Sequence, residues 1–424
     1  MTDVISTTAI NRVYPEGMKT IAFCLELQEK AEKWKAENYT FEVWDHSYEP
    51  EVPAIKRGIT NISYTNENRI FLEMNRNETA AYAIGNFKMD GSFDPFGPGD
   101  LGFPNPEREK KKQEAGKHDP VKGPGKDFGY MGPKPFRIEI YVKKEEKIVQ
   151  TLECSGWICE ELDCFQLKEL NGQKYLLYVP EQLEAGKEYP LVLFIADAGA
   201  RGTYDQGPLV QGTGAMVWTE PAEQYRHPCF VISPVYGPKD ILTHDDFTFD
   251  SKIYAMKDVV DDLKKEYPID GDQIFLTGQS MGCMSACQLM IRYPDYFAGA
   301  MLVAGQWEPV KTAEALKDKR VWILVSENDR KAYPGMNAVL NELKNQGGDY
   351  EVIFLDAKLP ENEIETQMRR EAAGNSNIKY TVFAGDSVVP DGMAAGPGSN
   401  HTCTWRVAYS IEAVRDWLLT ESRG

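Results

Sequence analysis

Several kinds of residue and pattern are scarce in this chain, and each absence excludes a class of protein. Lysine and arginine together number 47 against 65 aspartates and glutamates, which gives a formal net charge of −18. Nucleic acid and anionic membrane surfaces are therefore not expected as partners, because phosphate binding needs a basic face. The chain also lacks a run of about twenty apolar residues, so no transmembrane helix is expected.

The N-terminus lacks the pattern of a signal peptide. Residues 1–8 contain no basic stretch followed by an apolar core. We therefore expect either a cytoplasmic protein or a secreted one whose signal peptide is absent from this sequence.

Metal-ligand spacing is missing as well. The chain has eight cysteines, and Cys154, Cys159 and Cys164 recur every five residues without a Cys-x-x-Cys pair or a nearby histidine. Zinc sites are built from closely spaced cysteine and histidine ligands, so this pattern does not indicate one. We expect buried free thiols, no metal and no organic cofactor.

The most informative stretch that the chain does contain is residues 273–282. An apolar run with β propensity leads into Gly278-x-Ser280-x-Gly282, and the residues that follow have helical spacing. This order puts Ser280 on a sharp strand-to-helix turn, where hydrolases place a nucleophile. A side chain at either glycine would crowd the turn, and the helix N-terminus favours negative charge beside the serine. A chance match is the alternative, because the bare pattern is common.

The first 150 residues predict a small antiparallel β-sandwich, an accessory domain. Short segments alternate apolar and polar residues, with turn residues between them. No cluster in this part of the chain pairs a nucleophile with a base. The five predicted strands are residues 20–27, 39–44, 59–64, 69–74 and 136–142.

A long segment rich in glycine, proline and lysine, residues 85–135, interrupts this domain. A loop of such length without a regular pattern is usually disordered or functional. One interpretation is a solvated surface excursion; the other is a flap that reaches the active site or a neighbouring subunit. The surface excursion is the first choice, and the flap is the alternative because the segment has apolar side chains to bury, which are Phe93, Phe96, Phe103, Phe128, Tyr130 and Met131.

From residue 165 to residue 424 the pattern predicts an α/β domain. Continuous apolar strands, buried on both faces, alternate with amphipathic helices and indicate a mainly parallel sheet flanked by helices. The active site should lie at the C-terminal ends of the strands. The predicted strands are residues 173–179, 191–196, 229–233, 273–277, 298–304, 321–326, 350–355 and 379–383, and the predicted helices include 252–267, 336–345 and 410–419.

A serine nucleophile needs a general base, and the base needs a carboxylate that orients it. The chain has five histidines, and only His401 follows Ser280. It lies in a polar stretch that we predict to be a loop just before the closing helix, the position expected for the base. A surface histidine without a catalytic role is the alternative.

The carboxylate should follow the strand 321–326, because α/β-hydrolases carry their three residues in the order serine, acid, histidine. We choose Asp329, which lies far enough past the strand end to reach the histidine. Glu327 is the second choice. Asp356 and Asp386 follow later strands and fit less well.

Two backbone N–H groups should stabilise the oxyanion of a tetrahedral intermediate. We expect one from Met281 and one from Asp197 or Ala198, in the loop after the strand 191–196. Trp307 and Trp405 are candidates for an apolar substrate pocket, although core packing explains each of them equally well.

These motifs resemble a known family. The segment from about Phe165 onwards resembles the α/β-hydrolase fold, in the branch of polyhydroxybutyrate depolymerase-like and feruloyl-esterase-like hydrolases. The N-terminal part, through residues 56–60 and the strand at Arg69, is similar to the immunoglobulin-like domain of two-domain esterases. The matching stretches of the C-terminal part are residues 190–194, 201–202, 214–218, 228–231, 278–282, 327–334, His401 with Trp405, and 416–418.

One position departs from the family pattern. Members usually carry His-Gly where this chain has Ala196-Asp197. A carboxylate aimed at the oxyanion would oppose the developing negative charge, and the lost glycine narrows the available backbone conformations. We therefore predict that Asp197 points away from the oxyanion or contacts a donor on the substrate. An inward, unpaired carboxylate would imply weak or unusual activity.

The combined pattern predicts a serine hydrolase that cleaves small acyl or phenolic, feruloyl-type esters through an acyl-enzyme. Ser280 would attack the ester, His401 would transfer the proton, and Asp329 would hold the imidazole. A serine peptidase with the same three residues is one alternative, and a catalytically weak binding protein is another. The expected partner is a small-molecule ester, and homo-oligomerisation is left open.

Overall fold

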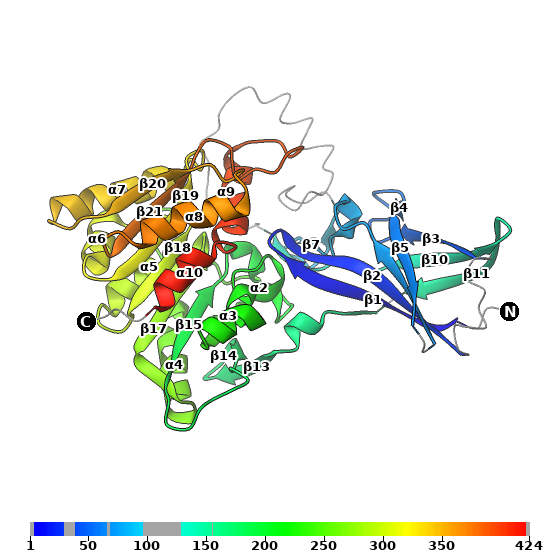
Figure 1. Ribbon diagram of the computed structural model, residues 1–424, viewed down its shortest axis with the longest axis horizontal. Coiled ribbons are helices and arrows are strands. Elements are labelled where there is room, and N and C mark those ends of the chain that lie inside the picture. The colour runs from blue at the N-terminus through cyan, green and yellow to red at the C-terminus, as the bar shows by residue number, and fades with distance from the viewer. Residues whose placement is uncertain (1–3, 29–38, 66–67, 96–128, 155, 421–424) are drawn as a thin grey trace. The chain divides into compact units, whose positions relative to one another are not determined.

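The computed structural model describes residues 4–28, 39–65, 68–95, 129–154 and 156–420 (Figure 1). The described chain divides into two compact units: an N-terminal unit of residues up to Asp163 without 129–130, and a C-terminal unit of residues 129–130 and those from Cys164 onwards. No helix in the described parts has the length and apolar character that crossing a bilayer would require.

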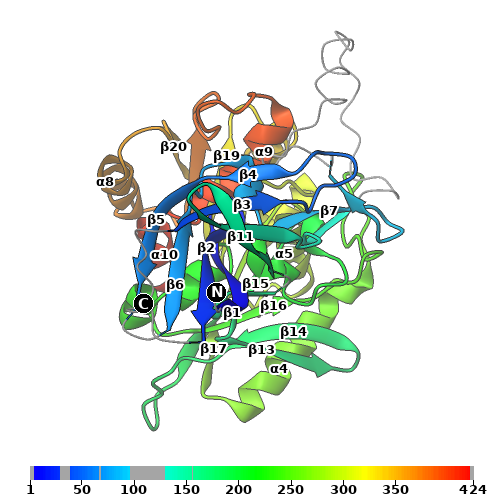
Figure 2. The same ribbon diagram turned by 90° about the vertical axis from the view of Figure 1, so that its right-hand side faces the viewer.

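The N-terminal unit is a sandwich of two β-sheets, as the alternating pattern predicts. One sheet has the order β12-β1-β2-β6-β5, and strands β1, β2, β6 and β5 of this sheet lie side by side in Figure 2. The other has the order β11-β10-β3-β4. Neighbouring strands are antiparallel except β1 and β12. The strands are β1 (Val4–Tyr14), β2 (Gly17–Leu27), β3 (Thr40–Asp45), β4 (Ile55–Arg57), β5 (Ile59–Tyr64), β6 (Arg69–Met74), β10 (Ile138–Lys144), β11 (Lys147–Cys154) and β12 (Trp157–Ile158).

Inward-facing side chains of both sheets form one core, which includes Phe23, Leu25, Val43, Ile70 and Ile140. All five predicted strands are present. The prediction missed β1, β4, β11 and β12; β4 and β12 are only three and two residues long.

The described ends of the segment 85–135 are strands, so the prediction of an irregular loop is wrong there. The short strands β7 (Ile84–Phe87), β8 (Phe93–Asp94) and β9 (Tyr130–Pro133) form a sheet of their own in the order β8-β7-β9. The side chain of Phe93 packs edge-on against Phe87. The middle of the segment, including Phe96, Phe103 and Phe128, lies outside the described residues.

Directly after β9, Lys134 is buried inside the N-terminal unit. Its ammonium group lies 2.6 Å from Oδ2 of Asp45 and donates to the carbonyl of Ala80 at 3.2 Å, and neither charged side chain is exposed. A buried ion pair of this kind is tolerated because each charge compensates the other. The pair ties the end of the insertion to strand β3.

The C-terminal unit contains a nine-stranded sheet in the order β13-β14-β16-β15-β17-β18-β19-β21-β20. Strand β14 pairs antiparallel with both of its neighbours, β13 and β16, and the remaining neighbouring strands pair parallel. All eight predicted strands occur, and β13 is additional. The strands are β13 (Phe165–Leu170), β14 (Gln173–Tyr178), β15 (Tyr189–Ile195), β16 (Phe230–Pro234), β17 (Ile269–Gln279), β18 (Gly299–Val303), β19 (Arg320–Ser326), β20 (Glu351–Leu355) and β21 (Ile378–Phe383).

Helices cover both faces of this sheet. The helices α4 to α7 pack on one face, where their side chains share a core with the strands. On the other face, Tyr409 packs against Phe194 and Trp417 against Trp322. The helices are α2 (Gly207–Val210), α3 (Pro221–Arg226), α4 (Ala255–Glu266), α5 (Met281–Arg292), α6 (Pro309–Leu316), α7 (Ala332–Asn345), α8 (Glu361–Ala372), α9 (Pro397–Ala408) and α10 (Glu412–Leu419). The predicted fold class, an α/β-hydrolase domain after an antiparallel β domain, is confirmed.

The buried ion pair yields a stability prediction for the N-terminal unit. Lys134→Met should lower its free energy of unfolding by about 3–5 kcal/mol, because the substitution leaves the charge of Asp45 buried and unpaired. The double variant Lys134→Met/Asp45→Leu should recover most of the loss. Calorimetry of the full chain measures both effects.

The matched control is Arg69→Met, which breaks the exposed pair of Arg69 with Glu26. Its effect should stay below about 1 kcal/mol. Equal losses in the control and in Lys134→Met would contradict the prediction.

Candidate active site

Ser280 lies on a sharp turn between strand β17 and helix α5. Its backbone has φ 53° and ψ −118°, a strained conformation for a residue with a side chain. The N–H of Ser280 donates to the carbonyl of Val303 at 3.0 Å, which holds the turn against strand β18. The predicted strand, serine and helix therefore occur in the predicted order.

The two glycines of the motif are required by close backbone contacts. A Cβ atom on Gly282 would lie 1.8 Å from the carbonyl oxygen of Ile195, at the end of β15. A Cβ atom on Gly278 would lie 2.6 Å from the carbonyl carbon of Gly282. The turn thus packs directly against the neighbouring strand, where there is no room for a side chain.

Of the three side chains selected from the sequence, His401 lies within hydrogen-bonding distance of both Ser280 and Asp329. Nε2 of His401 is 2.8 Å from Oγ of Ser280, and Nδ1 is 2.6 Å from Oδ2 of Asp329. A carboxylate only accepts, so Nδ1–H donates to Asp329 and Nε2 is left to accept from the serine hydroxyl. This tautomer can take a proton from Ser280.

Asp329 is almost fully buried, with 2% of its surface exposed. Its second oxygen, Oδ1, accepts from the backbone N–H groups of Lys331 and Ala332, both at 3.0 Å. Burial by itself would raise the pKa of Asp329, but the charge and hydrogen bond of His401, with these two N–H groups, outweigh it and hold the pKa below its usual range. The carboxylate is therefore ionised at neutral pH.

The other acids that the sequence offered have different partners. Glu327 accepts from the N–H of Gly385 at 2.8 Å. Asp386 accepts from the side-chain amides of Asn328 and Asn400. Asp356 caps a turn by accepting from the N–H of Lys358. Asp329 makes the hydrogen bond to His401, in place of these three acids.

His401 belongs to helix α9, so the prediction that it lies in a loop is wrong. The helix begins at Pro397, a residue favoured in the first turn because it lacks an N–H. The stretch Gly398-Ser399-Asn400 does not indicate the start of a helix, since such residues are common in loops. Buried Asn400 accepts from Ser326 Oγ at 2.7 Å and thereby fixes α9 to the end of β19.

The carboxylate of Asp197 is paired within the protein. Oδ1 accepts from the N–H of Gly199 at 2.7 Å, and Oδ2 accepts from the side-chain amide of Gln279 at 3.0 Å. Burial raises the pKa of Asp197, while the hydrogen bonds of Gln279 and Gly199 and the charge of His401 offset this only in part. Gln279 occupies an unspecified position of the Gly-x-Ser-x-Gly motif, so the motif did not indicate its role.

The expected N–H donors lie at two helix starts. Asp197 caps the short 3₁₀ helix Ala198–Ala200, and Met281 is the first residue of α5. N–H groups in the first turn of a helix have no partner inside that helix, so they remain available to an anion.

The two tryptophans differ in their surroundings. Trp307 is 1% exposed, belongs to the core and donates from Nε1 to Gln288 at 3.1 Å, which favours its packing role. Trp405 lies one turn after His401 on α9. The two rings pack edge to face, with their centroids 5.4 Å apart. Trp405 therefore supports the imidazole directly.

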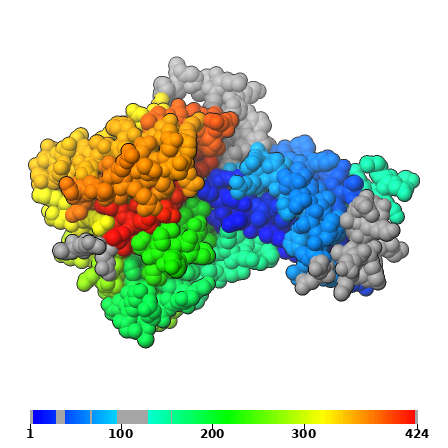
Figure 3. All heavy atoms as spheres, viewed as in Figure 1, coloured from blue at the N-terminus to red at the C-terminus, as the bar shows by residue number. Residues whose placement is uncertain are grey.

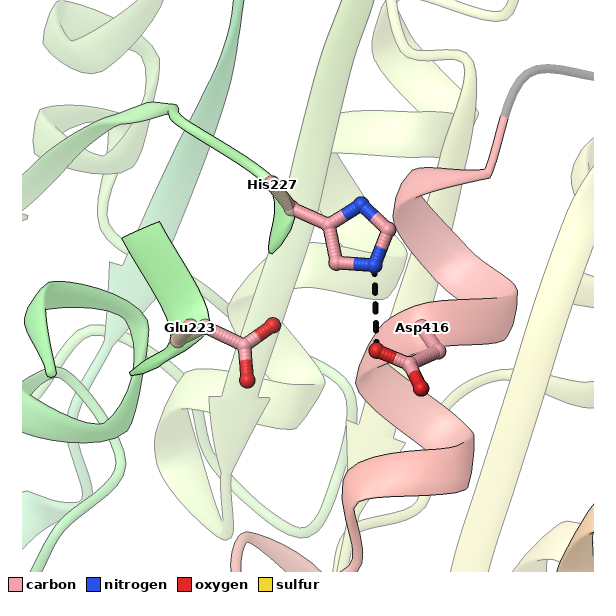
Figure 4. A group of neighbouring side chains, drawn as sticks. All are labelled: Glu223, His227 and Asp416. Atoms are coloured by element: carbon pink, nitrogen blue, oxygen red, sulfur yellow. Dashed lines mark hydrogen bonds and ion pairs between the residues drawn. The ribbon is translucent and has the colours of Figure 1, made fainter. Parts of the chain in front are cut away.

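Among the described residues, one group of three side chains has the spacing of a metal site: Glu223, His227 and Asp416 (Figure 4). Nε2 of His227 lies 3.0 Å from Oδ1 of Asp416. However, Arg226 donates to that same oxygen at 3.2 Å and to Glu223 at 2.8 Å. A metal ion would lie against this guanidinium, so the group is better explained as an ion-pair network that joins α3 to α10, which adjoin in Figure 3.

The fold and the arrangement of Ser280, His401 and Asp329 define the α/β-hydrolase class. Residues 249–407 match the Esterase family, whose description is "Putative esterase". The predicted resemblance to the α/β-hydrolase superfamily is thus confirmed.

Two known proteins extend this comparison. "Probable acetylxylan esterase A" of Aspergillus flavus is 27% identical over 134 residues, which span 31% of this chain and 41% of that protein. A solved structure described as "Crystal Structure of a Thermostable Esterase" has a TM-score of 0.70 at 21% identity and covers 99% of this chain and 100% of that one. The second likeness shows that the fold is shared along nearly the whole chain.

The close contact at Gly282 predicts that a single added methyl group lowers the stability of the C-terminal unit. Gly282→Ala should destabilise the C-terminal unit by at least about 2 kcal/mol, because the new Cβ overlaps the rigid carbonyl of Ile195. Gly271→Ala, on strand β17, is the control, since its Cβ would meet the flexible tip of Lys264. Thermal unfolding of both variants measures the difference, and an unaffected Gly282→Ala would refute the argument.

Proposed function

We propose that the C-terminal unit is a serine hydrolase that cleaves carboxylic esters through an acyl-enzyme. The observation that carries this proposal is the position of His401, whose two ring nitrogens lie 2.8 Å from Ser280 Oγ and 2.6 Å from Asp329 Oδ2. The match to the Esterase family supports the ester as substrate.

The first half-reaction forms a covalent intermediate. His401 Nε2 takes the hydroxyl proton of Ser280 while Oγ attacks the ester carbonyl carbon, and buried Asp329 stabilises the imidazolium. The tetrahedral intermediate then collapses, the carbon–oxygen bond to the alcohol breaks, and His401 returns the proton to the departing alkoxide. Ser280 now carries the acyl group.

The second half-reaction repeats these steps with water. His401 removes a proton from the water, the hydroxide adds to the acyl carbon, and Ser280 leaves with the proton that His401 returns. The carboxylic acid is released and the free serine is restored.

In both halves the negative charge on the former carbonyl oxygen would be held by the N–H of Met281 and by an N–H of the Asp197–Ala198 loop. The N-terminal end of α5 adds a favourable field at the same place. Donors of this kind act most strongly in the transition state, because the charge develops there.

Small acyl groups are the first substrates to test. The Aspergillus flavus relative is described as a probable acetylxylan esterase, which makes acetyl esters of carbohydrates suitable candidates. Phenolic esters such as methyl ferulate form a second group.

Removing the nucleophile should abolish turnover. We expect Ser280→Ala to lower kcat for p-nitrophenyl acetate by on the order of a millionfold, as in other serine hydrolases that lose their nucleophile. The control is Ser410→Ala, whose exposed hydroxyl only donates to the carbonyl of Val407. A fluorophosphonate should label the wild type and the control but not Ser280→Ala. Hydrolysis that survives in Ser280→Ala would contradict the proposal, and a wild type that neither reacts nor hydrolyses would indicate a binding protein.

Removing the negative charge that orients the base should also be costly. Asp329→Asn should lower kcat by about 10⁴, the cost known for the equivalent change in a serine protease, because the imidazole then adopts the wrong tautomer. Glu327→Gln, at the other acid of the same loop, should have little effect on kcat. Steady-state kinetics of both variants tests the assignment, which is wrong if Glu327→Gln shows the larger loss.

A further inference from the structure

The two N–H groups proposed to bind the oxyanion belong to different segments of chain, so something must fix the distance between them. Met281 follows β17, and Ala198 follows β15. The two strands pair directly, with Ile195 opposite Gly278. Beyond Ile195, however, the chain leaves the sheet, and strand pairing no longer controls the position of Ala198.

The side chain of Asp197 connects these two segments at that point. One oxygen accepts from the N–H of Gly199, within the loop, and the other accepts from the side chain of Gln279, directly before Ser280. Gln279 is only 2% exposed, so its side chain is a fixed anchor. A single carboxylate thus bonds to the loop and to the serine turn at the same time.

A second contact orients the loop. The peptide group between Ala198 and Gly199 gives its N–H to Asp197, and its carbonyl accepts from the buried guanidinium of Arg201. Arg201 also donates to the carbonyl of Pro238 at 2.8 Å, which anchors it outside the loop. The N–H of Gly199 is already used, which leaves the N–H groups of Asp197 and Ala198 for an oxyanion, and that of Ala198 is the one in the first turn of the 3₁₀ helix.

We infer that the pair Asp197 and Gln279 is a clamp that sets the separation between the N–H groups of Ala198 and Met281. Asp197 is then a positioning residue, which acts through the backbone of the loop and does not touch the substrate. This inference rests on the serine-hydrolase function proposed above. It also explains how this chain functions with an aspartate where the family pattern has glycine.

The clamp depends on hydrogen bonds and not on charge, which makes the conservative variant informative. In Asp197→Asn, the new carbonyl oxygen can still accept from Gly199. The new amide can donate to Oε1 of Gln279, an atom that is buried and has no hydrogen-bond partner in the described part of the chain. Rotation of the Gln279 amide by half a turn is enough to restore the second bond.

The experiment compares Asp197→Ala, Asp197→Asn and Gln279→Leu in the full-length chain. Asp197→Ala and Gln279→Leu should lower kcat for p-nitrophenyl acetate about 10- to 100-fold, because a displaced donor stabilises the transition state less. KM should change by less than about threefold, because the ground-state carbonyl carries little charge. Asp197→Asn should keep most of the wild-type kcat. The double variant Asp197→Ala/Gln279→Leu should have a kcat no lower than that of the less active single variant.

A boronic acid inhibitor separates this role from a general loss of stability. It forms a tetrahedral adduct with Ser280, so its Ki should rise by the same factor by which kcat/KM falls. The matched control is Asp270→Ala. Asp270 makes the same two kinds of bond, to the N–H of Asp272 and to the amide of Gln273, at the opposite end of β17, and its loss should leave kcat and Ki unchanged.

Two results would overturn the clamp. One is an Asp197→Ala variant with the kcat and Ki of the wild type; the other is an Asp197→Asn variant as impaired as Asp197→Ala. If Asp197→Ala does not fold, Gln279→Leu and Asp197→Asn decide the question. Failure of the underlying function has a different signature, because the wild type would then neither hydrolyse esters nor react with a fluorophosphonate.

Discussion

The contact between the serine turn and the end of strand β15 is the constraint on which the rest of the site depends. Because the backbone of Gly282 lies directly against the carbonyl of Ile195, the turn must be narrow and Ser280 must adopt a positive φ. The same contact places the first N–H of α5 near the loop that begins at Ala196. The strain in one residue therefore secures both a partly exposed serine and a site for negative charge.

The sheet order then brings the remaining groups to the serine. Parallel strands end at one edge of a sheet, so the segments after β17, β19 and β21 meet there although they are far apart in sequence. Asp329 follows β19 directly. His401 arrives on α9, which is attached to the end of β19 through Asn400 and Ser326. The acid and the base are thus held by the same strand end.

The sequence allowed much of this to be predicted, for reasons that differ between residues. Continuous apolar strands indicate a parallel sheet because they are buried on both faces, and His401 is the one histidine after Ser280. Helix α9 was missed because Gly398, Ser399 and Asn400 favour loops. The link from Asp197 to Gln279 joins residues 82 positions apart, and no local pattern encodes such a contact.

Two aspartates near His401 have pKa values that are shifted in opposite directions, and their partners explain why. Asp329 bonds to the imidazole, which can carry a positive charge, so its ionised form is favoured despite burial. Asp197 bonds to neutral amides, which compensate burial only in part, so its ionised form is disfavoured. A negative charge is useful beneath the imidazole, where it stabilises an imidazolium, and harmful beside an oxyanion. Each pKa shift thus runs in the direction that favours the proposed reaction, while both oxygens of Asp197 remain acceptors for Gly199 and Gln279.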